Sequence, residues 1–442
     1  MIIVLATAGC KNKNADLNTS TLEVFSDSLF QASIDSAKIA GAAIIVSQKD
    51  KILLDKAYGF ASLELSAPMP DEAQFEIGSG TKQFTAAAIL KLAEAKKLSL
   101  TDDFTKYIKF DTKGRFVTIK NLLNHTSGIP SYTELPEFEN LSIEKHPRDS
   151  LVRLVEQKDF LFEPGEILFY NNTGYFLLGL IIEKVTGKTY EDYLKETFFD
   201  PLGMNHTCYC SNTKVIKNKV YGYTYILDGL QQKQYLDHTW PFAAGSLCST
   251  TKDLLIWMKA LHNGKVFSDS LYQYMITPDK LNDGSIPHYA NGLVNFSNYG
   301  HKEIAHIGGI NGFLSDTRYF PDDNLYIICL VNTAGPHGAS YFADKITWKL
   351  MDKNEYTPHK IDINLHSLAG KYIGQVGRII TLEVRDIPNA LIITFEGQKN
   401  GDTLQTYLGN STWADGNSKI LLKNNECKLD QIYGYYILKK EN

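Results

Sequence analysis

The chain has 442 residues, of which 43% are hydrophobic and 21% are charged, a composition typical of folded globular proteins and unlike that of disordered or fibrous chains. Because this length exceeds the usual size of one hydrophobic core, we expect a large domain and a smaller one. The formal net charge is -5, and the 45 basic and 50 acidic residues are mixed along the sequence. No basic stripe is present to contact a phosphate backbone, which argues against nucleic acid as a partner.

The first residues, MIIVLATAGCKNKN, are apolar or small up to Cys10 and polar after it. Such a stretch cannot span a bilayer, which takes about 20 residues, but it is similar to the end of a bacterial lipoprotein signal. We therefore expect residues 1–19 to be a leader and linker, Cys10 to carry a lipid, and the protein to be exported to the periplasm or cell envelope. The alternative is a chance apolar start, since no Lys or Arg precedes the apolar residues.

After this leader, the apolar pattern predicts a helix, a pair of strands and a second helix. The first helix covers about 20–38, and the strands cover 42–48 and 51–59, on either side of a short turn. In the second helix, between Phe75 and Ser99, Ala, Leu and Ile occur almost all the way round. That distribution is typical of a helix buried inside a protein.

The remaining elements complete an α+β domain. Strands separated by Gly-rich or Asp-rich turns are predicted between 301 and 333. Further helices are predicted at about 147–157, 173–187, 189–198, 251–262 and 339–352. Together these elements predict a domain over 20–352 in which helices pack on an antiparallel sheet and a helical insertion interrupts the strands.

The end of the sequence differs in character. The polar stretch 353–360 is predicted to be a linker. Residues 361–442 contain short β-rich runs between Gly, Asn and Asp turns, which predict a small all-β domain or partial barrel. We identify no catalytic residues in this domain.

The cysteine count limits the role of disulfides. If Cys10 carries a lipid, five of the six cysteines remain, so at least one thiol is free. His206, Cys208 and Cys210 alternate, and on a strand they would share one face, as metal ligands do. No fourth ligand is evident nearby, so we expect an ordinary loop. No HExxH, Walker or dinucleotide motif is present, so no metal or nucleotide cofactor is expected.

A serine and a lysine lie three residues apart in the segment FEIGSGTKQFTAAAIL. On a helix, Ser79 and Lys82 would be neighbours on one face. A lysine desolvated by an apolar helix loses basicity and can take the proton of a serine hydroxyl, which makes the serine a nucleophile. The helix start also offers unpaired backbone N–H groups that could stabilise an oxyanion. The alternative is a Ser-Gly-Thr helix cap followed by a surface lysine.

The segment resembles the active-site helix of the serine β-lactamase and penicillin-binding-protein family, in the branch of class C β-lactamases, D-Ala-D-Ala carboxypeptidases and related esterases. Five other segments resemble this branch, and the similarity extends over about residues 20–350. These segments are LLNHTSGIPSY (122–132), FEPGEILFYNNTGYFLLGLIIEKVTGKTY (162–190), PLGMNHT (201–207), AAGSLCSTTKDLLIWM (243–258) and HIGGINGF (306–313). The resemblance implies a β-lactamase/transpeptidase-like fold for the large domain.

The resemblance also implies roles for individual residues. Ser79 would be the nucleophile and Lys82 its basic partner, and Tyr170 would carry protons to and from the serine and the leaving group. We expect the neighbouring ammonium to favour the anion of Tyr170. Asn172 would donate to the amide oxygen of the substrate and hold Lys82.

The third element of the family is His306-Ile307-Gly308, on a strand that would border the substrate. True β-lactamases and carboxypeptidases have Lys-Thr-Gly here, and that lysine is a fixed cation suited to a substrate carboxylate. His306 should be mostly neutral at pH 7, which puts carboxylate recognition in doubt. Gly309 resembles the position whose backbone N–H completes the oxyanion hole with that of Ser79. For His125, in LLNHTSGIP, we expect a structural role.

These residues imply a serine hydrolase without a cofactor, acting through an acyl-enzyme on an amide, lactam or ester of a small molecule or peptide. One alternative is an esterase or amidase without a cell-wall role. Another is a non-hydrolysing penicillin-binding or sensor protein, in which water cannot reach the acyl-enzyme. The only membrane contact expected is the lipid on Cys10.

Overall fold

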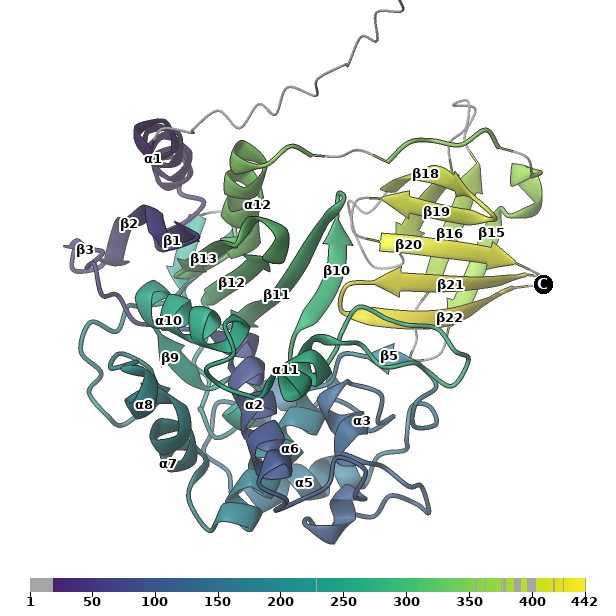
Figure 1. Cartoon of the computed structure of the whole chain (residues 1–442), viewed down its shortest axis with the longest axis horizontal. Coiled ribbons are helices and arrows are strands. Elements are labelled where there is room, and N and C mark those ends of the chain that lie inside the picture. Colours follow the sequence, from purple (N-terminus) through teal and green to yellow (C-terminus); the bar gives the residue numbers. More distant parts are fainter. Residues whose placement is uncertain are drawn as a thin grey trace, which may run out of the picture.

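A computed structural model describes residues 19–441, except 228, 354–355, 362, 375, 377–378, 385–390, 396–402, 416–417 and 424. The predicted leader and Cys10 lie outside the described residues. Figure 1 shows a mixed helical and sheet body with a separate β-sheet beside it, formed by the end of the chain. Within the described part of the chain, no helix is both long and apolar enough to cross a membrane.

The body is built on a seven-stranded antiparallel sheet in the order β10-β11-β12-β13-β1-β2-β3. Strand β1 pairs with β13 so that Ala42 lies opposite Val331, which joins the two ends of the domain. The strands are β1 (Gly41–Gln48), β2 (Lys51–Ser62), β3 (Ala67–Pro68), β10 (Val294–Asn298), β11 (His301–Ile310), β12 (Phe313–Phe320) and β13 (Leu325–Val331).

Alternation along β1 separates two hydrophobic cores. Ile44 and Val46 point to one face, where helices α1 (Thr19–Asp35) and α12 (Ala339–Leu350) cover the sheet. Ala43 and Ile45 point to the other face and join the larger core beneath the remaining helices. Successive side chains of a strand face opposite sides, so a strand buried on both sides is apolar throughout, as β1 is.

The helical insertion supplies most of the larger core. Helices α2 (Lys82–Glu94) and α6 (Asn172–Thr186) pack against each other in its centre. The other helices are α3 (Ile119–Leu123), α4 (Phe138–Leu141), α5 (Arg148–Glu156), α7 (Tyr190–Leu194), α8 (Asp200–Leu202), α9 (Phe242–Gly245), α10 (Thr251–His262) and α11 (Asp269–Ile276). The predicted helices at 147–157, 173–187, 189–198 and 251–262 are confirmed in position, although a π-helical turn at Lys195–Phe199 ends the third.

The predicted helix from Phe75 to Ser99 is shorter than expected. Phe75–Glu76 form strand β4, Gly78–Thr81 form a 3₁₀ turn, and the α-helix begins only at Lys82 and ends at Glu94. Gly78 has a φ of +50°, which L residues with a side chain rarely adopt and which a regular helix does not allow. This turn places Ser79 immediately before the helix rather than within it.

The C-terminal region is all-β, as predicted. In the described part of this region the strands are paired in chain order, and β15 also pairs with β22, so the sheet closes on itself. A strand of the large domain, β5 (Leu168–Phe169), extends this sheet by pairing with β22. The strands are β15 (Gly370–Gly374), β16 (Ile379–Val384), β17 (Leu391–Phe395), β18 (Thr403–Gly409), β19 (Thr412–Asp415), β20 (Ser418–Lys423), β21 (Glu426–Gln431) and β22 (Gly434–Lys440).

Candidate active site

Ser79 and Lys82 are hydrogen-bonded at the start of α2. The Lys82 Nζ lies 2.9 Å from the Ser79 Oγ, 2.8 Å from the Oδ1 of Asn172 and 2.8 Å from the carbonyl oxygen of Ala244. Lys82 is fully buried, and burial lowers its pKa well below the usual value. A neutral amine with a lone pair can accept the serine proton, so this arrangement suits a general base.

Tyr170 and Asn172 reach the same place from the junction of β5 and α6. Asn171 caps α6, because its side chain accepts a hydrogen bond from the N–H of Gly174, and this fixes the position of the two neighbouring residues. Asn172 then holds Lys82 with its oxygen and donates from Nδ2 to the Thr133 hydroxyl at 3.1 Å. The Tyr170 ring lies 4.9 Å from the Lys82 Nζ.

The protonation of Tyr170 differs from our expectation. Burial raises its pKa above the usual value, and the nearby Ser79 hydroxyl offsets this only in part. Tyr170 is therefore neutral in the resting protein. The predicted phenolate required a charged lysine beside it, but burial disfavours the charge on Lys82 as well. A neutral Lys82 and a protonated Tyr170 are the forms that this site favours.

Strand β11 borders the site closely. A side chain on Gly308 would place its Cβ 2.1 Å from the carbonyl oxygen of Ile77, and one on Gly78 would place it 2.7 Å from the carbonyl oxygen of Gly309. Only glycine allows the strand to approach the Ser79 turn this closely. The oxyanion role of Gly309 remains a prediction, and this close approach is compatible with it.

His306 lies behind the site rather than in it. Its ring is fully buried, with Nε2 3.1 Å from the Tyr289 hydroxyl and Nδ1 2.5 Å from the carbonyl oxygen of Ile307. Burial is the main cause that lowers its pKa to about 3, so the ring is neutral. His125 is also buried, and its Nδ1 accepts the backbone N–H of Asn171 at 3.1 Å, which is a structural contact next to Tyr170.

A cavity of about 570 Å³ opens above Ser79. Among the described residues, none of the side chains that line it belongs to Lys, Arg or His. Five of the eleven described residues that line it come from the C-terminal region, which the sequence did not connect with the site. The cavity is lined by Ser79, Glu134, Phe169, Tyr170, Ile307, Gly309, Ser418, Gln431, Ile432, Tyr433 and Tyr436.

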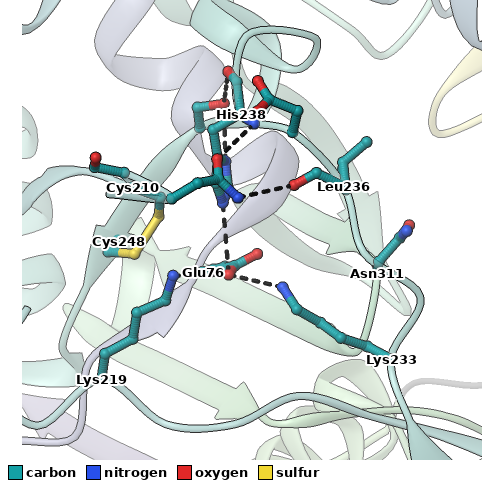
Figure 2. Close-up of polar contacts among 12 residues, drawn as sticks. Glu76, Cys210, Lys219, Lys233, Leu236, His238, Cys248 and Asn311 are labelled. Carbon is teal, nitrogen blue, oxygen red and sulfur yellow. Dashed lines mark hydrogen bonds and ion pairs between the residues drawn. A yellow bond between two sulfur atoms is a disulfide. The ribbon is translucent and has the colours of Figure 1, made fainter. Parts of the chain in front are cut away.

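A buried charge cluster supports the strand that leads to Ser79. Figure 2 shows Glu76 facing Lys233, Lys219 and His238, whose nitrogens lie 2.7, 3.1 and 3.5 Å from its Oε1. Burial by itself would raise the pKa of Glu76, but His238 and the two ammonium groups outweigh it and lower the pKa. The carboxylate is therefore charged and compensated.

A disulfide lies beside this cluster (Figure 2). Cys210, which directly follows strand β6 (Cys208–Tyr209), is bonded to Cys248 of strand β9 (Leu247–Ser249), and Cys248 is the register partner of Glu76. The sequence did not predict this pair. Instead of the expected loop, Cys208–Tyr209 form strand β6, and among the described residues no group of three or more metal-ligating side chains occurs. Cys208, Cys329 and Cys427 are free thiols, which confirms the expectation that at least one cysteine is not in a disulfide.

The model of the β-lactamase family matches residues 26–347, well over half of the chain. The chain belongs to the β-lactamase family. Ser79, Lys82 and Tyr170 lie within the matched range. Membership of this family supports the interpretation of the chain as a serine hydrolase.

Named relatives and solved structures agree with this family. The chain is 29% identical over 317 residues to Protein flp of Staphylococcus aureus (69% of this chain, 62% of the relative), so it spans less than two thirds of that protein's length. It is 30% identical over 308 residues to penicillin-binding protein 4* of Bacillus subtilis (65% and 67%). The octameric penicillin-binding protein homologue of Pyrococcus abyssi is 26% identical with a TM-score of 0.67, over 96% of this chain and all of that one.

Proposed function

We propose that the protein hydrolyses amides or esters through an acyl-enzyme on Ser79, and that its substrates carry no carboxylate beside the bond that is cleaved. The observation that carries this proposal is the fully buried Lys82 amine, 2.9 Å from the Ser79 Oγ at the base of an open cavity. Few arrangements other than nucleophile activation explain an amine held in this way.

The reaction follows from the protonation states. Neutral Lys82 accepts the proton of Ser79 as Oγ attacks the carbonyl carbon, and the carbonyl becomes an oxyanion held by the N–H groups of Ser79 and Gly309. The bond to the leaving group then breaks, and Tyr170 gives its proton to the departing nitrogen or oxygen while Lys82 returns a proton to Tyr170. Water attacks the acyl-enzyme by the same route in reverse and releases the acid.

The charges around the cavity favour an amidase or esterase over a D-Ala-D-Ala carboxypeptidase. Recognition of a terminal carboxylate on a substrate needs a cation in the cavity. Among the described residues that line the cavity there is no Lys, Arg or His, and the acidic side chain present is Glu134. His306 cannot replace the lysine of the carboxypeptidases, because it is buried and neutral.

Labelling with a fluorescent fluorophosphonate tests the nucleophile. We expect the wild type to be labelled and Ser79→Ala to be unlabelled, whereas equal labelling of both would contradict the assignment. A nitrophenyl ester, an amino-acid amide and a D-Ala-D-Ala peptide then distinguish the substrate classes, and we expect the peptide to be the poorest. Intact mass after incubation with the nitrophenyl ester tests the non-hydrolysing alternative: a lasting acyl adduct supports a sensor, and release of the acid with a return to the free mass supports the hydrolase.

We also propose that the protein works outside the cytoplasm. The Cys210–Cys248 disulfide supports this, because such bonds persist mainly in oxidising compartments. The apolar start ending at Cys10 supports lipid attachment. Metabolic labelling with a fatty acid in the wild type and in Cys10→Ser tests it, and equal labelling of the two would exclude this anchor.

A further inference from the structure

The tight turn between β21 and β22 lies at the cavity. Gln431 pairs with Gly434, so Ile432 and Tyr433 form a two-residue turn, and both line the cavity with Ser79. The turn is placed by the same pair of strands that places Tyr170. Gly434 is opposite Phe169 in the β22–β5 ladder, and therefore the next residues along, Tyr433 and Tyr170, face each other.

Several contacts fix the Tyr433 ring. Its centroid lies 5.7 Å from that of Tyr170, 6.0 Å from that of Tyr289 and 5.5 Å from that of His306. Its hydroxyl accepts a hydrogen bond of 2.8 Å from the backbone N–H of Ile307. Four rings in mutual contact with one anchored hydroxyl hold Tyr433 in a single position.

The occupied N–H belongs to the free edge of β11. Strand β10 pairs with β11 only as far as Ala305, so among the described strands β12 alone pairs with residues 306–310. An extended substrate could add to this edge by main-chain hydrogen bonds. The Tyr433 hydroxyl is hydrogen-bonded to the backbone N–H of Ile307, and the His306 ring is hydrogen-bonded to the carbonyl oxygen of Ile307. The backbone of Gly309 therefore remains accessible to a substrate beside Ser79.

The blocked side of the cavity is the leaving-group side. In the proposed reaction Tyr170 protonates the leaving group, so this group lies next to Tyr170. Tyr433 lies beside Tyr170, and its hydroxyl occupies the backbone N–H of Ile307 on strand β11. A leaving group that continued as a peptide would need to displace the Tyr433 hydroxyl from Ile307.

We infer that Tyr433 is a specificity-determining residue that closes the leaving-group side of the cavity and restricts the enzyme to amides and esters with compact, uncharged leaving groups. This inference rests on the proposed function, which it makes more specific. The surrounding side chains agree with it, because Ile307, Ile432 and Phe169 present an apolar surface to the same cavity.

The test compares two esters of N-acetyl-D-alanine, the compact methyl ester and the glycolamide ester, whose leaving group continues like a peptide. We expect the wild type to prefer the methyl ester, and Tyr433→Ala to reduce this preference in kcat/KM about tenfold or more, as when a pocket loses a group that excludes part of a substrate. Tyr433→Phe keeps the ring but frees the Ile307 N–H, so its preference should lie between the two.

Tyr435→Phe is the matched control. The Tyr435 hydroxyl bonds the Ser285 Oγ at 2.7 Å and does not line the cavity, so this variant should keep the wild-type ratio. Fluorophosphonate labelling of Ser79 is measured on every variant. If wild type is not labelled, the proposed function itself fails. If wild type and Tyr433→Ala are both labelled but have the same ratio of the two esters, the inference about Tyr433 is wrong.

Discussion

Two sets of residues meet at the cavity, and they are held in different ways. The Ser79 cluster consists of Ser79, Lys82, Tyr170 and Asn172. Hydrogen bonds join Lys82 to Ser79 and Asn172, and the Tyr170 ring lies 4.9 Å from the Lys82 Nζ. The C-terminal wall, consisting of Gln431, Ile432, Tyr433 and Tyr436, comes from strands β21 and β22 and the turn between them, in a sheet that shares its core with Leu168 and Tyr289. The first set determines whether a bond can be cleaved, whereas the second determines which molecules fit.

The largest effect should come from the Ser79 cluster. Lys82→Met removes the base, and we expect the rate of Ser79 acylation to fall about 10³-fold for every substrate, whatever its leaving group. Lys91→Met, on the same helix but partly exposed, is the control and should keep the wild-type rate. Stopped-flow acylation with a nitrophenyl ester measures both variants. A loss confined to long substrates would mean that Lys82 acts on fit rather than chemistry.

The pH dependence tests the charge on Lys82. Its lowered pKa makes the amine neutral over a wider range, so the rate should fall as pH decreases through a value below the ordinary 10.5. Asn172→Asp would put a carboxylate where the amide oxygen now lies 2.8 Å from Nζ, and should move this limb to higher pH by about 1 to 3 units. Fluorophosphonate labelling rates across pH provide the profile. If the pH at which the rate falls is the same in Asn172→Asp and wild type, the titrating group is not Lys82.

The support beneath Ser79 should be sensitive to loss of charge. Glu76→Gln leaves Lys219, Lys233 and His238 without their common carboxylate, and we expect it to cost about 3 to 5 kcal/mol of stability. Because the pKa of Glu76 is lower in the folded state, the carboxylate stabilises the folded protein. This stabilisation is complete above pH 4.5, the ordinary pKa of the group, and is lost as the pH falls below that value. Urea unfolding at several pH values measures this, with Glu64→Gln as an exposed control. Equal effects of the two variants would show that burial of Glu76 is unimportant.

Loss of the disulfide should cost somewhat less. The bond closes a loop between residues 38 apart, for which the chain-entropy estimate is about 4 kcal/mol at most. We expect Cys248→Ser to lower the midpoint of urea unfolding and to make the midpoint insensitive to a reducing agent, while the wild type remains sensitive. A wild-type midpoint that reductant does not change would contradict the bond.

The smallest effect should come from the contacts that dock the C-terminal wall. The Lys428 Nζ lies 2.6 Å from Asp283, but the pair is partly exposed, so Lys428→Met should cost less than about 1 kcal/mol. The β5–β22 pairing and the shared core remain, and the preference between the two esters should stay as in wild type. A changed preference would show that a single ion pair positions the turn.

The same contrast explains what the sequence could predict. The sheet and its helices follow from apolar periodicity. The spacing of Ser79 and Lys82 by itself also allowed a helix cap, and the resemblance of the surrounding segments was needed to propose them as catalytic residues. Tyr433 is 354 positions beyond Ser79, and the sequence IYGYYILKK around it predicts only a short β-strand. The place of Tyr433 at the cavity depends on how the C-terminal sheet docks. The protonation of Tyr170 was wrong for a related reason, because burial is a property of the folded state and not of the motif.

The division between the two sets of residues has an evolutionary consequence. Ile432 and Tyr433 occupy a two-residue turn outside the strand ladder and lie at the edge of the core that the sheet shares with Leu168 and Tyr289, so their replacement leaves the backbone pairing of the strands unchanged. Gly78 and Gly308, in contrast, have no room for even a methyl group. Descendants of this chain could therefore acquire new substrates by altering the turn alone, and grafting turns of other lengths is a direct route to engineered selectivity.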